Sequence, residues 1–162
     1  MLSLSIDGAE ALQARLDAFP DAVQSALAAK AQDLASALAD KVKSEKLSGQ
    51  VLAARSGALL ASIGAEVSND GDEVSASVGS YGDVKYAAIQ EYGGKTGAHE
   101  ILPVKAKVLA FLAGGAMRFA AKVEHPGSVI PQRSYLRSSL DEMSAEILAA
   151  LAATPAETWE DA

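Results

Sequence analysis

Residues 20–46, PDAVQSALAAKAQDLASALADKVKSEK, have the clearest helical pattern in the chain. Pro20 suits the first position of a helix, and Asp21 falls in the first turn, where the helix dipole favours negative charge. Apolar side chains recur at helical spacing and form one stripe: Val23, Leu27, Leu34, Leu38 and Val42. The pattern predicts one long helix over residues 20–46, with a shorter amphipathic helix before it over residues 8–18.

A β-hairpin is expected after this helical part. Residues 59–68 and 73–79 both have strand patterns, and in the second strand Val74, Ala76 and Val78 alternate with small or polar residues. Between them the Asp-Gly step of residues 70–71 supplies the positive φ that a tight hairpin needs.

The remaining segments complete an α+β fold. We predict a short helix over 85–92 that ends at a Gly-Gly pair, strands over 101–111 and 118–123 around a turn at 114–115, and a last helix. That helix is expected to open at Ser134 or Ser138 and to end near Leu151. The fold class is therefore α+β, with a long N-terminal helix, an antiparallel sheet with a hairpin, a short central helix and a C-terminal helix.

The chain is expected to form one domain over residues 1–153, with an N-terminal helical arm over 1–46 and a loose polar tail over 154–162. Forty-nine per cent of residues are apolar, but alanine supplies much of that share and only eight residues are aromatic. Alanine-rich helices bury little apolar surface per residue, so they gain stability by packing closely on a partner surface. That partner could be another copy of the chain.

Composition excludes several classes of site. The chain has no cysteine, which excludes disulfides, thiolate nucleophiles and cysteine-based metal sites. The first twenty residues are charged and lack the apolar run of a signal peptide or a membrane anchor. No window has the roughly 18 apolar residues of a spanning helix. We expect a soluble protein that is made in the cytoplasm and does not contact a membrane.

Charge is distributed unevenly along the chain. The net charge of −7 has the wrong sign for general nucleic-acid binding. Residues 101–140 nevertheless carry six basic and one acidic side chain, a local +5 that leaves −12 for the remainder, and residues 141–162 have six acids and no base. Such a chain can bring its basic segment against an acidic one, within itself or on a neighbour. The alternative is two solvated faces.

The sequence offers little catalytic or metal-binding chemistry. His99 and His125 are the only strong transition-metal ligands, and each lies in a Gly- or Pro-flanked stretch without a second ligand at a metal-binding interval. We expect both in loops, with rings facing solvent. No nucleophile elbow or phosphate-binding loop occurs. Glu91 and Glu100 could act as paired carboxylates, but chance proximity among 21 acidic residues explains them. The prediction is a protein that is not an enzyme and has no cofactor or metal.

Two segments have the mixed aromatic, aliphatic and charged composition of a protein-docking surface: residues 84–94, VKYAAIQEYGG, and residues 130–137, IPQRSYLR. Tyr86, Ile89 and Tyr92 lie three residues apart and share one helix face. Ordinary core packing is the alternative for the first two, whereas Tyr92 beside the glycine pair is the better interface anchor.

The second segment supplies basic side chains. If a helix begins here, Arg133 and Arg137 lie one turn apart on either side of Tyr135 and offer two guanidinium groups to carboxylates of a partner. The alternative for Arg137 is surface solubility.

Three segments together resemble a known family. Residues 55–63, RSGALLASI, are similar to R-[ST]-G-x-L-x-x-S-I, and residues 86–93, YAAIQEYG, to Y-A-x-x-x-E-[FY]-G. Residues 130–137 resemble I-P-A-R-P-F-L-R, although Gln132 and Ser134 stand where alanine and proline are usual. The elements and their order resemble tail-completion or head–tail joining proteins of tailed bacteriophages, also described as neck, minor tail or virion-morphogenesis proteins. The likeness covers residues 47–143.

The resemblance implies a structural virion protein. Such subunits form a ring, usually a hexamer, at the head-proximal end of the tail, where the ring completes or terminates the tail and joins it to the head. The implied partners are other copies of the chain, the tail-tube protein and the head connector or stopper protein, with DNA passing through the lumen without specific binding. The implied location is the neck or tail junction of the virion, after assembly in the host cytoplasm.

The candidate interface residues are Arg55, Tyr86, Glu91, Tyr92, Arg133, Tyr135 and Arg137. Two alternatives stay open. One is a neck or head-closure component of the same particle. The other is a nucleic-acid-binding adaptor that uses the basic residues Lys105, Lys107, Arg118 and Lys122.

Overall fold

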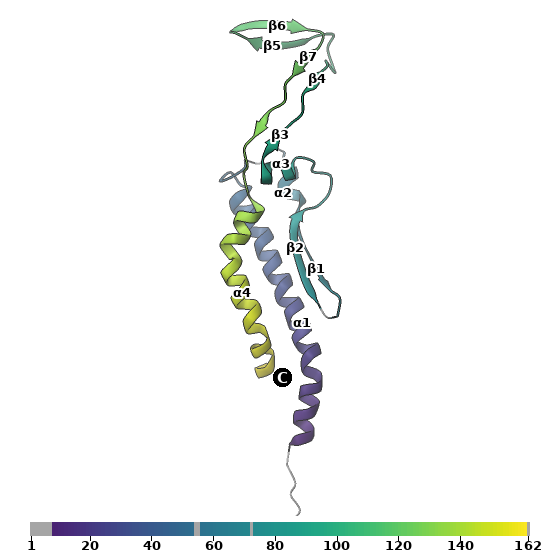
Figure 1. The fold of residues 1–162 in the computed structure, drawn as a ribbon, viewed down its shortest axis with the longest axis vertical. Helices are drawn as coiled ribbons and strands as arrows, with labels where there is room; N and C mark the ends of the chain where they lie inside the picture. Colours follow the sequence, from purple (N-terminus) through teal and green to yellow (C-terminus); the bar gives the residue numbers. More distant parts are fainter. Residues whose placement is uncertain (1–7, 54–55, 72, 162) are drawn as a thin grey trace, which may run out of the picture. The chain divides into compact units, whose positions relative to one another are not determined.

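The computed structural model describes residues 8–53, 56–71 and 73–161 and has the predicted α+β composition (Figure 1). The helices are α1 (Ala9–Lys41), the π-helix η1 (Val42–Lys46), α2 (Ala58–Ser62), α3 (Ala87–Tyr92) and α4 (Leu136–Asp161). The strands are β1 (Ile63–Asn69), β2 (Val74–Ser80), β3 (Gly94–Lys95), β4 (His99–Ile101), β5 (Leu109–Ala113), β6 (Ala116–Ala120), β7 (Val123–His125) and β8 (Val129–Ile130). None of the helices in these ranges is both long enough and apolar enough to cross a bilayer.

The contacts of the chain divide it into two compact units. We call residues 1–87 with 134–162 the helical unit and residues 88–133 the ribbon unit. The single domain expected over residues 1–153 stays a prediction.

In the helical unit, α1 is one continuous helix rather than the two that were predicted. It begins after Gly8, and Pro20 lies inside it instead of at its first position. An interior proline removes one backbone hydrogen bond. The helix continues through it because side chains before Pro20 also pack on α4: Arg15 and Phe19 both contact Trp159. At its other end the helix widens into η1, where the Leu47 N–H donates to the carbonyl oxygen of Val42.

Helix α4 runs beside α1 in the opposite direction and ends at Asp161 (Figure 1). The predicted end near Leu151 was wrong, and residues 154–161 of the expected loose polar tail are helical, whereas residue 162 lies outside the described residues. Thr154 is buried, and its hydroxyl donates to the Ala150 carbonyl oxygen at 2.9 Å. The last two turns are held against α1 by Trp159 and by an ion pair between Glu157 and Lys30.

The predicted hairpin is confirmed. Strands β1 and β2 pair antiparallel from Ile63 opposite Ser80 to Asn69 opposite Val74. The turn between them closes with the Asp70 N–H donating to the Glu73 carbonyl oxygen at 3.0 Å. The first strand begins later than expected, because residues 58–62 form α2 after a glycine with positive φ.

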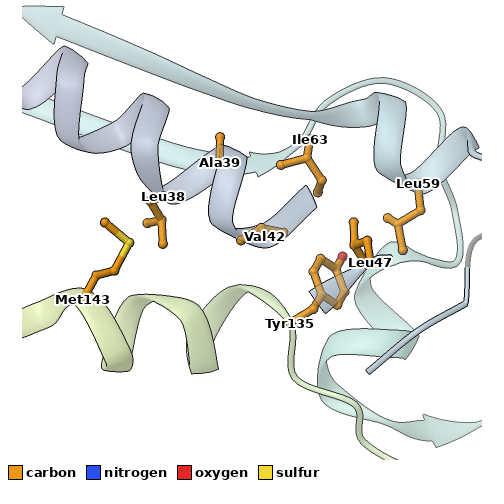
Figure 2. Packing of buried hydrophobic residues seen from close by; sticks show 8 residues of the cluster. All are labelled: Leu38, Ala39, Val42, Leu47, Leu59, Ile63, Tyr135 and Met143. Carbon is orange, nitrogen blue, oxygen red and sulfur yellow. The ribbon is translucent and has the colours of Figure 1, made fainter. Parts of the chain in front are cut away.

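The core of the helical unit lies where α1, η1, α2, β1 and α4 meet (Figure 2). Its side chains come from segments far apart in sequence: Leu38, Ala39, Val42, Leu47, Leu59, Ile63, Tyr135 and Met143. Val42 and Tyr135 are almost completely buried, and the Tyr135 hydroxyl donates to the Ala87 carbonyl oxygen at 3.3 Å. This hydrogen bond lets a tyrosine occupy an apolar site without leaving its hydroxyl unpaired.

The ribbon unit is a set of nested antiparallel pairs, β3–β8, β4–β7 and β5–β6. The first two pairs share one register, in which Lys95 faces Val129 and His99 faces His125. Residues 102–108 then loop out, and only residues 121–122 separate the returning strands, so β5–β6 pairs in a shifted register around the predicted Gly-Gly turn. The continuous strand expected over residues 101–111 was therefore wrong. Pro103 lies in the looped-out stretch, where it has no N–H to donate to a ladder.

Candidate assembly interface

The two segments singled out in the sequence meet in the ribbon unit. Strand β3 pairs with β8, with Gly94 opposite Ile130, and the Arg133 N–H donates to the Gln90 carbonyl oxygen at 2.9 Å. At Gly93, φ is +70° and an added Cβ would lie 2.7 Å from the backbone nitrogen of Gln132. The close approach of the two segments therefore requires glycine at this position.

The first segment contains the predicted short helix, which forms as α3. Tyr86 precedes it and is 42% exposed, whereas Tyr92 ends it and is 64% exposed. Ile89 is half-buried, and its side chain lies against Gly94. Glu91 is buried. Of this group, Tyr92 presents the largest aromatic surface to solvent.

The second segment departs from the prediction. Because α4 begins at Leu136, Arg133 and Arg137 are not one helical turn apart, and the expected pair of guanidinium groups on one helix was wrong. Both arginines are exposed. Tyr135 lies in the core, which gives it a structural part in place of the predicted contact with a partner. Arg55 lies outside the described residues.

His99 and His125 are cross-strand partners in β4 and β7, not residues of separate loops. Their rings stack with centroids 5.1 Å apart and an interplanar angle of 27°. The Nδ1 atom of His125 accepts a hydrogen bond from the Gly127 N–H at 3.0 Å, so the proton of the neutral ring is on Nε2. A metal bound between both Nε2 atoms would require that proton to move to Nδ1 and break the bond to Gly127.

No group of three or more potential ligand side chains that could hold a metal occurs in the described ranges. The histidine pair is therefore better explained as a cross-strand contact that supports the β4–β7 pairing. That the protein has no metal, cofactor or catalytic activity stays a prediction.

The ribbon unit has a feature that the sequence analysis missed. All of its residues are described, none of its apolar side chains is buried, and it contains ten of the sixteen large apolar side chains that are exposed among the described residues. They are Tyr92, Ile101, Leu102, Val104, Val108, Phe111, Leu112, Met117, Phe119 and Val129. A two-stranded ribbon is at best marginally stable in water. This much exposed apolar surface is typical of a surface that a partner covers.

The pairing of β5 with β6 gathers part of this surface on one face. Ala110 lies opposite Phe119 and Leu112 opposite Met117, and cross-strand partners at alternate positions share a face. We call these four residues the tip patch. All four are exposed, with Leu112 at 71% and Phe119 at 67%, and no charged side chain interrupts them. In the sequence, Met117 and Phe119 alternate with Arg118, and this alternation contained part of the signal.

The two units carry opposite charge. The ribbon unit has six basic and three acidic residues, a net +3, which leaves −10 for the helical unit. Residues 102–123 contain no acid and four bases: Lys105, Lys107, Arg118 and Lys122. One of these is already paired, since the Lys122 ammonium lies 3.0 Å from a Glu100 oxygen and 4.0 Å from Glu124. The bases beside the tip patch favour an acidic surface as its partner.

Comparison with protein-family models, with curated proteins and with solved structures found no match for this chain. The family resemblance of the three short segments therefore stays a prediction, and the functional argument depends on the surface just described.

Proposed function

We propose that this chain is a structural virion protein that forms a sixfold ring at the head-proximal end of a bacteriophage tail. The ring completes or terminates the tail and joins it to the head connector. The observation that carries the proposal is the ribbon unit, which exposes ten large apolar side chains and buries none. A surface of this kind is completed by neighbouring subunits. The three ordered segments that resemble phage tail-completion proteins supply the biological setting.

The opposite charges of the two units support contacts between copies, which a ring requires. A ring needs head-to-tail contacts between two different patches of the same subunit. Here the ribbon unit is basic and the helical unit is acidic, so one copy offers both halves of a complementary contact. The proposed further partners are the tail-tube protein on one side of the ring and the head connector or stopper protein on the other, with DNA passing through the lumen. The proposed location is the neck of the virion.

Light scattering coupled to size-exclusion chromatography tests self-assembly. Six copies of the 16.6 kDa chain form a particle of about 100 kDa, and negative-stain images of that fraction should show rings. Antibodies raised against the chain should label particles released by the source cells at the junction of head and tail. A compact monomer at high concentration, together with particles that carry no label, would contradict the proposal.

A neck or head-closure role within the same particle is the nearest alternative. A reconstruction of the labelled particles separates the two, because a tail terminator contacts the last tail-tube ring and a head-closure protein contacts the connector.

A nucleic-acid-binding adaptor is the alternative from another class, and the acid-free stretch over residues 102–123 is the observation that favours it. Gel shifts with duplex DNA at rising salt test it, with Lys105→Glu/Lys107→Glu as the matched variant. Under the ring proposal the wild-type chain gives no shift at physiological salt. A salt-dependent shift that the variant loses would favour the adaptor.

A further inference from the structure

We propose that the tip patch of one subunit docks on the helical unit of the next copy and forms the repeating contact of the ring. This inference rests on the proposed ring function and identifies the surface that the ring uses. Its premises are the apolar face formed by Ala110, Leu112, Met117 and Phe119, and the opposite charges of the two units.

The first premise concerns the face itself. Leu112, Met117 and Phe119 are 59% to 71% exposed, although they are the side chains that usually contribute most to a core or an interface. Both long edges of the β5–β6 pair are also unpaired within the described residues. A strand pair that is apolar on one face and open at its edges gains stability when a second molecule covers it.

The second premise identifies the surface on which the tip patch docks. Two tips packed face to face would bring two acid-free stretches of four bases together, which is unfavourable. The helical unit of a second copy carries −10 and also exposes apolar side chains, with Leu140 at 46% and Leu148 at 69% on α4. It therefore provides both an apolar contact and a countercharge. An anionic membrane would also attract the basic tip, so vesicle binding without self-association is an outcome that the test must separate from docking on a second copy.

The size of a typical interface shows that residues outside the tip patch must also contribute to the contact. A specific protein contact buries about 800 Å² on each partner, which is more than four side chains can supply. The looped-out stretch beside the tip, with Val104 at 94% exposure and the ammonium groups of Lys105 and Lys107, lies next to the patch in sequence and extends it. The contact should therefore weaken with salt as well as with loss of apolar area.

The first experiment compares variants by light scattering at matched concentrations. Leu112→Ser/Phe119→Ser should lower the mass from ring to monomer, while far-UV circular dichroism and the emission of Trp159 stay unchanged because both side chains are exposed. The matched control is Val129→Ser, which replaces a 78% exposed apolar residue of the same unit outside the patch and should keep the ring. Lys105→Glu/Lys107→Glu, in the looped-out stretch that extends the patch, should weaken assembly at least tenfold.

The second experiment locates the contact. Because the chain has no cysteine, Leu112→Cys gives a single site for a photoactivatable maleimide cross-linker. Mixing isotopically light and heavy subunits separates contacts between copies from contacts within one. We expect light–heavy cross-links from residue 112 to peptides of the helical unit.

The outcomes separate the docking surface from the ring function. Rings that persist in Leu112→Ser/Phe119→Ser overturn the docking proposal and leave the ring function standing. If the wild-type chain forms oligomers that are not rings, and these dissociate in the variant, the result supports the docking surface and counts against the ring. Three other results would overturn the proposal. They are cross-links that form only within one chain, cross-links that form only between two tips, and binding to phosphatidylserine vesicles without self-association.

Discussion

The free ends of α1 and α4 are held together by an aromatic contact that can be tested with one substitution. Phe19 and Trp159 form an edge-to-face pair with centroids 5.2 Å apart, and the Arg15 guanidinium lies 4.1 Å above the Trp159 ring. We predict that Phe19→Leu, which keeps most of the apolar volume but removes the ring, destabilises the helical unit by about 1 kcal/mol.

The arginine should matter less than the ring. Its contact with the indole contributes about 0.5–1 kcal/mol and its hydrogen bond to the Trp159 carbonyl oxygen about 1 kcal/mol. Against this, the Arg15 Nε atom is buried without a hydrogen bond within the described residues, which costs about 1–3 kcal/mol. These terms nearly cancel. Arg15→Ala should therefore change the free energy of unfolding by less than Phe19→Leu.

Trp159 is the only tryptophan and reports directly on this contact. A loss of 1 kcal/mol multiplies the undocked population of the helix end about fivefold, so Phe19→Leu should shift the emission to the red and increase acrylamide quenching. Urea unfolding followed by circular dichroism gives the global change. Phe111→Leu makes the same chemical change in the ribbon unit and serves as control.

Equal quenching and equal urea midpoints for wild type and Phe19→Leu would refute the reasoning. So would a loss from Arg15→Ala well above that from Phe19→Leu, because it would mean that the buried Nε carries no desolvation cost.

Three further predictions concern the core, the ion pairs and the ribbon. Hydrogen bonds from Lys46 and from a second lysine lower the pKa of Glu142. The ionised carboxylate therefore stabilises the fold at pH values above the ordinary carboxylate pKa, and this stabilisation is lost as the pH falls through the lowered pKa. Glu142→Gln should flatten the acid side of a Tm–pH profile, and an unchanged profile would contradict this. Leu47→Ala should cost about 2–4 kcal/mol by urea unfolding, because Leu47 is 2% exposed, and a loss below 1 kcal/mol would show that the site collapses. Gly127→Ala should speed amide exchange throughout the ribbon unit, because φ is +87° and an added Cβ would overlap a neighbouring carbonyl oxygen. Gly114→Ala is the control: φ is also positive there, but an added Cβ would meet no atom, so the effect should be smaller.

Local patterns predicted much of the fold. The alternation of residues 74–78 and the Asp-Gly step identified the β1–β2 hairpin, and the glycine pair at 93–94 marked the end of α3. Pro20 was misread as a helix start and the last helix was expected to end near Leu151, because the contacts that continue both helices involve Arg15, Phe19 and Trp159. Those contacts join residues more than 130 positions apart, and no local pattern reports them.

The candidate site was less accessible from sequence. The pairing of residues 90–95 with 129–133 was not predicted, and the burial of Tyr135 depends on where α4 begins. The stacking of His99 on His125 depends on how many residues loop out on each side of the ribbon. Extending the pairing outward from the Gly-Gly turn would have missed it, because the register shifts between the two ladders.

The unequal connections at residues 102–108 and 121–122 separate the end of the ribbon from its base. The backbone bonds at the base do not depend on how many residues the far end contains, so insertions or exchanges there leave the base intact. The chain is in this respect modular: a different distal loop could be fitted to a different neighbour without redesigning the rest. Sequence divergence among relatives should therefore concentrate in residues 102–122.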